Sequence, residues 1–226
     1  GFTTTGATIL SEIESLPHGL LYWRSFTHWL GGMGVLVFVM AVMPLSGDHS
    51  MHIMRAEVPG PTVGKLVPRA RKTAIILYLI YLGLTVLETV LLLFGGMSFY
   101  EALLHAFSTA GTGGFSTNAA SIGGFHSEYI ETVVTVFMFL FGVNFSLYFH
   151  FLIAPPKSKL RTFFQDEEFR WYFGTTVSFI LLLTLLNLSY YDDHLIQSFR
   201  YSAFQVCSVF STTGFVTYNF NAWPVA

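Results

Sequence analysis

Three short stretches rich in threonine and glycine stand out in an otherwise apolar chain, and their residue types could bind a cation. We call them segment 1 (residues 3–8), segment 2 (residues 112–117) and segment 3 (residues 212–217). Glycine permits unusual backbone dihedral angles and leaves neighbouring carbonyl groups unobstructed. Carbonyl oxygens that converge on an axis can replace the water shell of a cation, and such hard ligands suit alkali cations rather than zinc or copper. The three segments therefore predict an ion selectivity filter.

The segments align on their central glycines, Gly6, Gly114 and Gly214. Between segments 2 and 3 the match extends at an offset of 100 residues, because Ser108 corresponds to Ser208. Self-similarity at a long period indicates a repeated structural unit. The alternative, three ordinary turns outside the membrane, is disfavoured because each copy has the same position relative to its hydrophobic neighbours. The candidate filter residues, with an alkali cation as the only metal expected there, are Thr4, Thr5, Gly6, Thr112, Gly113, Gly114, Thr212, Thr213 and Gly214.

The composition points to a membrane protein. Of 226 residues, 53% are hydrophobic and only 11% are charged, whereas soluble domains carry about 25% charged residues. The net charge of −2 gives no basic face for nucleic acid, so no nucleic-acid partner is expected. The single cysteine, Cys207, excludes an internal disulfide and a multi-cysteine metal site.

Four hydrophobic runs are long enough to cross a bilayer, which requires roughly 20 helical residues. Two shorter and more mixed stretches, 98–110 and 195–210, predict half-depth helices that lead into segments 2 and 3. The expected fold is an all-α multi-span membrane protein with repeated helix, half-helix, filter loop and helix units around a pore, here incomplete. The expected spanning runs are residues 19–44, 73–95, 129–153 and 171–190.

Charge placement orients these runs. Of eleven lysines and arginines, nine lie in the connections 45–72 and 155–170, and the positive-inside rule makes both connections cytoplasmic. The chain opens directly on segment 1 and stops shortly after segment 3, so we expect a fragment of a longer protein. The expected organisation is the end of a first repeat at 1–44, a connection at 45–72, a second repeat at 73–153, a connection at 154–170 and the start of a third repeat at 171–226.

Polar and small residues inside the runs have a packing and a functional interpretation. Gly31, Gly32 and Gly34 predict a patch where another helix approaches closely, and a dinucleotide loop is disfavoured because no strand precedes them. Glu88 is a functional candidate as an intramembrane carboxylate, although a partner on a neighbouring helix is favoured. Asn144 is expected to be an interhelical hydrogen-bond donor rather than a ligand.

The sequence resembles the Trk/Ktr/HKT superfamily of cation transporters, especially its bacterial potassium-uptake members. The resemblance covers nearly the whole chain and implies four helix–filter–helix repeats around one pore. It also implies a homodimer in the bacterial inner membrane, in contact with lipid and with a cytosolic nucleotide-binding regulatory subunit. The matching residues are segment 1, Arg24 with 29–34, 57–61, 65–69, Thr73, Ala74, 113–117, Asn144, Phe145 and 212–215.

The resemblance implies potassium uptake by the full-length parent, with potassium as substrate and no covalently bound cofactor. This chain has three filter segments where the family has four, so we do not expect the fragment to conduct alone. In the family, serine in place of the first filter glycine is associated with sodium passage. Gly6, Gly114 and Gly214 favour potassium, while a sodium-permeable or sodium- or proton-coupled relative remains an alternative.

Two alternatives come from other functional classes. An intramembrane enzyme would use Ser108 or Ser116 with one of the histidines, but no third group is apparent to orient a histidine and no Gly-x-Ser-x-Gly motif is present. The chain is therefore not expected to be an enzyme. A non-transporting membrane scaffold would explain the glycines by packing alone. The histidines considered are His105, His126 and His150.

The basic connection before the second spanning run is a candidate docking surface for the regulatory subunit. Its candidate residues are Lys65, Arg69, Arg71 and Lys72. Their charge density and the family resemblance motivate this hypothesis. Simple determination of membrane topology explains the same charges equally well.

Overall fold

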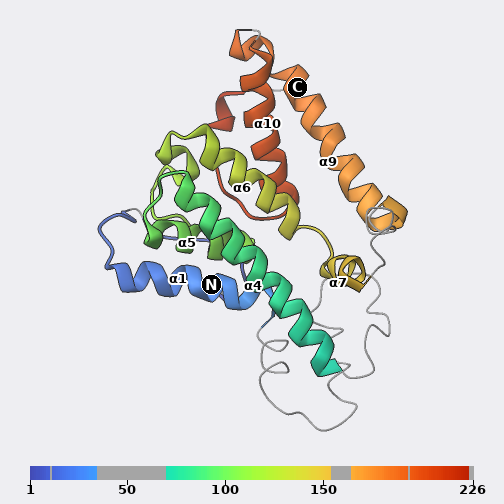
Figure 1. Ribbon diagram of the computed structural model, residues 1–226. Coiled ribbons are helices and arrows are strands. Elements are labelled where there is room, and N and C mark those ends of the chain that lie inside the picture. Colours follow the sequence, from blue (N-terminus) through green and yellow to red (C-terminus); the bar gives the residue numbers. More distant parts are fainter. Residues whose placement is uncertain (11, 35–69, 154–163, 193, 224–226) are drawn as a thin grey trace.

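The computed structural model describes residues 1–10, 12–34, 70–153, 164–192 and 194–223. Within these ranges every regular element is a helix (Figure 1). The longer helices are α1 (His18–Gly32), α4 (Ala70–Phe94), α5 (Phe99–Ala110), α6 (Glu128–Phe141), α7 (Phe145–Ile153), α9 (Glu167–Leu186) and α10 (Leu195–Phe210). Short 3₁₀ helices follow segment 2 (η1, Ser121–Phe125), α9 (η3, Ser189–Tyr191) and segment 3 (η4, Phe220–Ala222).

Within the described ranges, two helices are long and apolar enough to span a membrane individually. They are Ala74–Phe94, with mean hydropathy 2.3, and Glu167–Leu186, with mean hydropathy 1.4. They lie close to the predicted runs 73–95 and 171–190. Helix α9 begins before residue 171 because Asp166 caps it, accepting a hydrogen bond from the Phe169 N–H at 2.8 Å. Both helices run upward in Figure 1, as expected if both preceding connections lie on one side.

The predicted run 129–153 is not one straight span. Helices α6 and α7 are bent by 87° at a short break, and together they could still form one broken span. Gly142 ends α6, and the Asn144 side-chain oxygen accepts the Ser146 N–H at 2.9 Å at the start of α7. The Asn144 amide also donates to Glu168 Oε2 on α9 at 3.0 Å. Asn144 is therefore the interhelical donor that we expected, and its second hydrogen bond helps to break the helix.

The first predicted run, 19–44, is only partly within the described residues. Its described part is α1, which has 15 residues. Close approach occurs at two of the three glycines predicted to allow it. A Cβ on Gly32 would lie 2.6 Å from the Gly111 Cα, and a Cβ on Gly31 would overlap the Phe2 carbonyl oxygen. These contacts bring segment 1 and the end of α5 against α1.

The two stretches predicted to be half-depth helices form the helices α5 and α10. Helix α5 begins with a capping box, because Ser98 Oγ accepts the Glu101 N–H and Glu101 accepts the Ser98 N–H. It packs against α4, α1 and α6, while α10 packs against α9 and α6. Helices α5 and α10 thus each contact the long apolar helix before them and the helix that follows the previous Thr-Gly segment.

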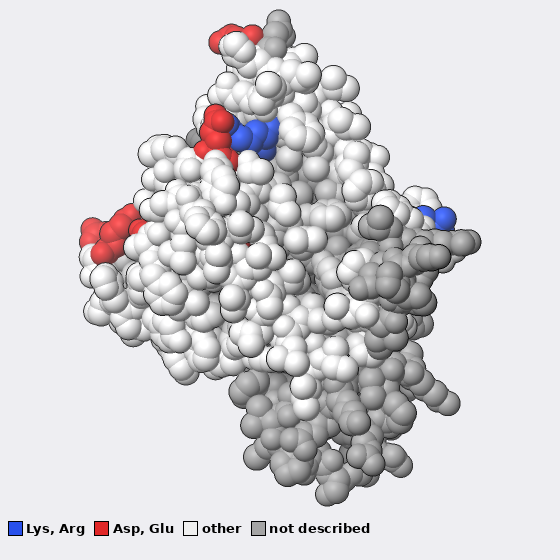
Figure 2. Space-filling view, viewed as in Figure 1, with Lys and Arg blue, Asp and Glu red and all other residues white. Residues whose placement is uncertain are grey.

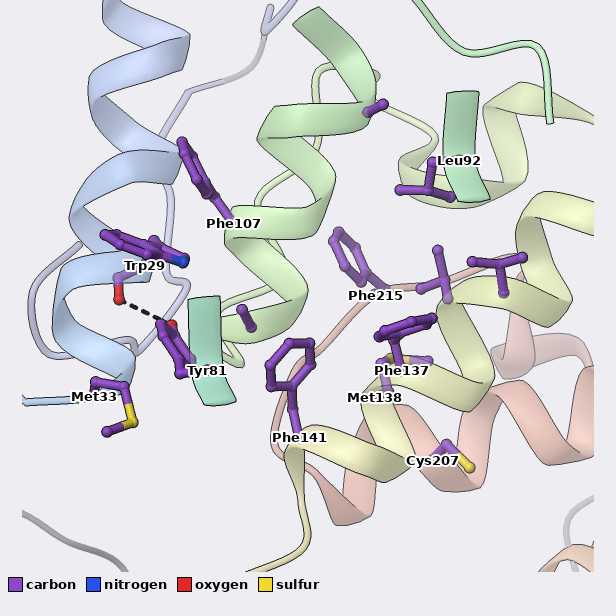
Figure 3. Close-up of a cluster of buried hydrophobic side chains, with 14 of the residues drawn as sticks. Trp29, Met33, Tyr81, Leu92, Phe107, Phe137, Met138, Phe141, Cys207 and Phe215 are labelled. Atoms are coloured by element: carbon purple, nitrogen blue, oxygen red, sulfur yellow. Dashed lines mark hydrogen bonds between the residues drawn. The ribbon is translucent and has the colours of Figure 1, made fainter. Parts of the chain in front are cut away.

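An aromatic core joins α1, α4, α5 and α6 (Figure 3). The Tyr81 hydroxyl donates to the Trp29 carbonyl at 2.9 Å, and the Trp29 indole N–H donates to Thr85 Oγ1 at 3.1 Å. Phe215 of segment 3 belongs to the same buried cluster and is completely buried. The core therefore fixes the backbone of a Thr-Gly segment directly.

The surface of the described chain is largely uncharged on the face that Figure 2 shows. Arg200 of α10 forms ion pairs with Glu128 and Glu131 of α6. Leucines of α4 and α9 are exposed, including Leu79 and Leu185 at 60% and 67%. Such exposed apolar surface is expected on helices that face lipid.

Candidate functional site

The three Thr-Gly segments share an uncommon backbone conformation. In each one a threonine and the glycine two residues later lie in the left-handed region. A left-handed conformation costs an L-residue roughly 1–2 kcal/mol, and it is rare for a β-branched side chain. The same two positions are affected three times: φ is 51°, 49° and 58° at Thr4, Thr112 and Thr212, and 70°, 69° and 82° at Gly6, Gly114 and Gly214.

The left-handed threonines of segments 2 and 3 follow directly from how the half-depth helices end. The Gly113 N–H donates to the Ser108 carbonyl at 2.9 Å, and the Thr213 N–H donates to the Ser208 carbonyl at 2.9 Å. This is the six-residue closure of a Schellman motif, in which glycine usually takes the left-handed position. The carbonyl ends of α5 and α10, which carry partial negative charge, therefore adjoin the segments.

The segments lie side by side in chain order. A Cβ on Gly6 would overlap the carbonyl oxygen of Gly113, and a Cβ on Gly114 would overlap that of Thr213. In both cases the carbonyl precedes the aligned glycine of the next segment. A Cβ on Gly214 would meet nothing within 4 Å among the described residues. Segments 1 to 3 thus follow one repeated step, and none of the described residues takes the corresponding position beside Gly214.

Segment 2, in the middle, is the most enclosed of the three. Gly113 is buried and both Thr112 and Gly114 are half-buried. In segment 3, Thr213 is buried but Thr212 and Gly214 are exposed. This difference follows from the contacts above, because only segment 2 has a neighbouring segment on each side.

Two side chains of α1 support segment 2 from behind. The Arg24 guanidinium lies 3.8 Å from the centre of the Phe115 ring, and the His28 ring stacks on the same phenyl ring at 3.9 Å. A Cβ on Gly113 would overlap the His28 ring. His28 is completely buried, and neither ring nitrogen has a hydrogen-bond partner among the described residues. We did not predict this contact. The one sequence feature that could have indicated it is the four-residue spacing of Arg24 and His28, which places both side chains on one face of α1.

A hollow of about 480 Å³ lies beside the end of segment 2. Glu14 lines it, and the Glu14 carboxylate accepts the backbone N–H of Ala119 at 2.9 Å. That hydrogen bond lowers the pKa of the Glu14 carboxyl below its ordinary value. The loop before α1 is thereby tied to the residues that follow segment 2.

Of the histidines and serines considered for an enzyme, the structure brings one pair together. His105 Nε2 lies 3.0 Å from Ser116 Oγ, and His105 Nδ1 lies 2.7 Å from the Glu101 carbonyl oxygen. This carbonyl is the orienting group that the sequence did not reveal. His126 and His150 are exposed and lie elsewhere. The pair lies between α5 and segment 2, and both side chains are buried.

Two further candidates have different outcomes. Glu88 of α4 is completely buried beside Thr109 of α5, with no hydrogen bond of standard geometry at either carboxyl oxygen among the described residues. The docking candidates Lys65 and Arg69 lie outside the described residues. Arg71 and Lys72 lie in the first turn of α4, where the structure describes only the helical backbone.

The sequence is similar to those of known cation transport proteins. The family model described as "TrkH: Cation transport protein" matches residues 1–226. The Trk system potassium uptake protein TrkH of Salmonella typhimurium is 40% identical over 100% of this chain and 46% of its own length. The protein of the same name from Escherichia coli K12 is 39% identical, also over 46% of its length. This chain therefore spans about half the length of these relatives.

A solved structure shows the same fold. The crystal structure of the potassium transporter TrkH from Vibrio parahaemolyticus superposes with a TM-score of 0.80 at 34% sequence identity. The match covers 99% of this chain and 44% of that protein. The all-helical architecture described above is therefore that of a membrane transporter.

Proposed function

The chain belongs to the TrkH family of cation transport proteins, which are transporters and not enzymes, and on that premise we propose that its full-length protein takes up potassium through a pore lined by segments 1 to 3. The observation that carries this proposal is the repeated backbone geometry. Three segments place a left-handed threonine and glycine at the same two positions and contact one another by the same step. Uncommon backbone conformations repeated at one place indicate function rather than chance.

This geometry suits a dehydrated cation. The left-handed glycines allow successive carbonyl groups to be redirected without a side chain in the way. The carbonyl ends of α5 and α10 add partial negative charge beside the segments. We propose that the carbonyl oxygens of all three segments surround one potassium ion, and that a fourth segment outside this chain occupies the open position after Gly214. The remainder of the protein is thus required for conduction.

The names of the relatives support potassium as the transported ion. The proteins from Salmonella typhimurium and Escherichia coli are Trk system potassium uptake proteins. Glycine at all three aligned positions agrees with potassium rather than sodium preference. We place the full-length protein in the bacterial inner membrane as a multi-pass protein in contact with lipid. A sodium-permeable or sodium- or proton-coupled relative is the alternative, and the experiment below distinguishes it.

Gly114→Ser in the full-length protein tests the filter. The half-buried Gly114 is left-handed and lies against the Thr213 carbonyl, so a side chain must displace the neighbouring segment. We expect the ratio of rubidium to sodium uptake to fall at least about tenfold, since selectivity depends on the number and geometry of oxygen ligands. Uptake would be measured in cells without other potassium uptake and normalised to surface protein. Wild-type protein that favours sodium would support the sodium-permeable alternative.

Ser108→Ala is the matched control for that experiment. Ser108 is also buried in α5 near segment 2, but its hydroxyl has no hydrogen-bond partner among the described residues. Ser116→Ala is unsuitable, because Ser116 bonds to His105. An unchanged uptake ratio in Gly114→Ser at normal surface amount would mean that Gly114 is not a filter residue and that the three segments are wrongly aligned.

We propose in addition that the full-length protein is a homodimer and that the basic connection docks a cytosolic nucleotide-binding subunit. The charge of Lys65, Arg69, Arg71 and Lys72 supports this proposal, as does the fact that the relatives are named as proteins of a Trk system. Reversing the charges of Arg71 and Lys72 should weaken co-purification with that subunit. Normal binding by a correctly inserted variant would leave topology determination as the role of these charges.

A further inference from the structure

A chain of hydrogen bonds links the buried face of α5 to the residues after the segment 2 glycine. His105 Nδ1 faces the Glu101 carbonyl at 2.7 Å, and His105 Nε2 faces the Ser116 hydroxyl at 3.0 Å. The Ser116 oxygen also accepts the Asn118 N–H at 3.0 Å. His105 is completely buried and Ser116 is 8% exposed. Ser116 lies two residues after Gly114, so these hydrogen bonds hold the backbone directly after the proposed filter.

The partners determine where the hydrogens lie. A carbonyl oxygen only accepts, so a neutral His105 must carry its proton on Nδ1 and donate to Glu101. Nε2 is then an acceptor, and the Ser116 hydroxyl must donate to it. The remaining lone pairs of Ser116 accept from Asn118. Each hydrogen bond in this series therefore has a fixed donor and a fixed acceptor. A side chain with a different arrangement of donors and acceptors could not replace His105.

His105 also touches segment 3. Its ring centre lies 6.0 Å from that of Phe215 and 5.1 Å from that of Phe125, which it meets edge to face. His105 therefore contacts segment 2 through Ser116 and segment 3 through an aromatic ring. The next half-depth helix does not repeat this support, because Gln205 and Val216 stand at the positions aligned with His105 and Ser116.

Segment 3 is supported by a different group. The Ser208 hydroxyl donates to the Phe215 carbonyl at 2.7 Å. The aligned Ser108 makes no such bond among the described residues. The half-depth helices thus share a backbone closure but use different side chains to support their segments: a serine in the third repeat and a histidine with Ser116 in the second.

We propose that His105 is a positioning residue of the potassium filter, which sets the backbone direction of segment 2 through its hydrogen bond with Ser116. The proposal rests on the function proposed above and adds a residue that contacts no ion. It assigns Ser116 the role of the link between α5 and segment 2. Loss of the acceptor nitrogen should therefore change ion preference, whereas loss of ring bulk alone should change mainly packing.

The experiment compares two substitutions of His105 in the full-length protein. His105→Phe keeps an aromatic ring against Phe125 and Phe215 but removes both nitrogens. His105→Gln restores a side-chain oxygen that can accept from Ser116. We expect His105→Phe to lower the rubidium-to-sodium uptake ratio about fivefold, the factor that corresponds to one hydrogen bond of about 1 kcal/mol. His105→Gln should stay within about twofold of wild type, and Ser108→Ala is the control.

A double substitution separates positioning from general damage. Ser116→Ala should reproduce the effect of His105→Phe, and the double variant should fall no further, because both changes remove one hydrogen bond. A purely structural role would lower surface amount and thermal midpoint but leave the uptake ratio unchanged. If His105→Phe fails to reach the membrane, Ser116→Ala decides: an unchanged ratio at normal surface amount overturns the proposal.

Gly114→Ser, measured in parallel, distinguishes this inference from the function on which it rests. If Gly114→Ser lowers the ratio while His105→Phe and Ser116→Ala do not, the filter stands and the positioning role of His105 is wrong. If none of the three changes the ratio, the filter assignment itself is wrong.

Discussion

The left-handed threonines are the residues that most clearly link conformation to the proposed function. Thr112 and Thr212 occupy positions where glycine would cost less backbone strain. Threonine at both places suggests that its hydroxyl or its stiffness is needed there. Threonine hydroxyls are hard oxygen groups of the kind that bind alkali cations. The strain is held in place by the helix closures at Ser108 and Ser208.

The aligned serines provide a prediction with an internal control. Ser208→Ala removes the hydrogen bond to the Phe215 carbonyl and leaves that carbonyl without its partner. We expect the free energy of unfolding to fall by about 1–2 kcal/mol and the rubidium-to-sodium uptake ratio to fall with it. Ser108→Ala should change stability by less than about 0.5 kcal/mol, since its hydroxyl has no partner in the described part of the chain.

Thermal unfolding in detergent and uptake in cells would measure both serine variants. Equal effects of the two substitutions would contradict the distinction between the repeats. A larger effect of Ser108→Ala would show that residues outside the described ranges bind that hydroxyl.

The sequence predicted the centre of the candidate site but not its supports. The Thr-Gly pattern identifies Gly114, because a left-handed backbone conformation favours glycine at that position and is therefore visible in the local sequence. The contact of His28 with Gly113 joins residues about 85 positions apart, and no local pattern specifies it. His105 and Ser116 were noticed, but their pairing depends on how the chain turns after α5. Side-chain support of this kind becomes visible only in three dimensions.

At the level of elements, short helices were predicted more accurately than long runs. Helices α5 and α10 match the predicted stretches 98–110 and 195–210. Helix α5 is bounded by the Ser98 cap and Gly111, and α10 lies between the polar residues His194 and Ser211. The run 129–153 is mostly apolar, so its hydropathy gave no sign of the 87° bend. Gly142 and Asn144 carry the break, through a helix end and a side-chain hydrogen bond that hydropathy does not measure.

Glu88 of α4 allows the packing and functional interpretations to be separated. Its carboxyl group is completely buried and lacks a hydrogen bond of standard geometry among the described residues, while the Thr109 hydroxyl donates instead to the His105 carbonyl. Glu88→Leu preserves approximate volume and removes the buried polar group. We expect the free energy of unfolding to rise by about 1–3 kcal/mol if Glu88 only packs.

Thr85→Val on the same helix is the matched control for Glu88→Leu. Thr85 accepts the Trp29 indole N–H at 3.1 Å, so this substitution should lower the thermal midpoint. Rubidium uptake at equal surface amount would be measured for both variants. Loss of uptake in a stable Glu88→Leu protein would reject the packing interpretation and give Glu88 a functional role.

At the level of the whole molecule, each predicted repeat packs against the next. Helix α1, which follows segment 1, packs on α5, and α6, which follows segment 2, packs on α10. The ion pairs of Arg200 with Glu128 and Glu131 strengthen the second of these contacts. Segment contacts follow the same order, and among the described residues Gly214 has no further segment beside it. The arrangement therefore explains why potassium uptake is assigned to the full-length protein rather than to these residues alone.

This arrangement requires a fixed orientation in the membrane, which charge placement predicts. Nine of eleven lysines and arginines lie in the connections 45–72 and 155–170, so both should be cytoplasmic and the Thr-Gly segments should face the outside. Single cysteines at Ser50 and Ser158 should resist an impermeant thiol reagent in intact cells. Ala119→Cys, at an exposed site after segment 2, should react from outside and is the positive control.

The background for that experiment is Cys207→Ala, because Cys207 is 3% exposed within the apolar core and a buried serine hydroxyl would need a partner. Permeabilised cells should expose Ser50→Cys and Ser158→Cys to the reagent, which verifies that both thiols are reactive. Labelling of either position in intact cells would reverse or break the proposed topology. Labelling of Ser50→Cys would also place the basic docking candidates, which lie in the same connection, on the side of the membrane where a cytosolic subunit cannot reach them.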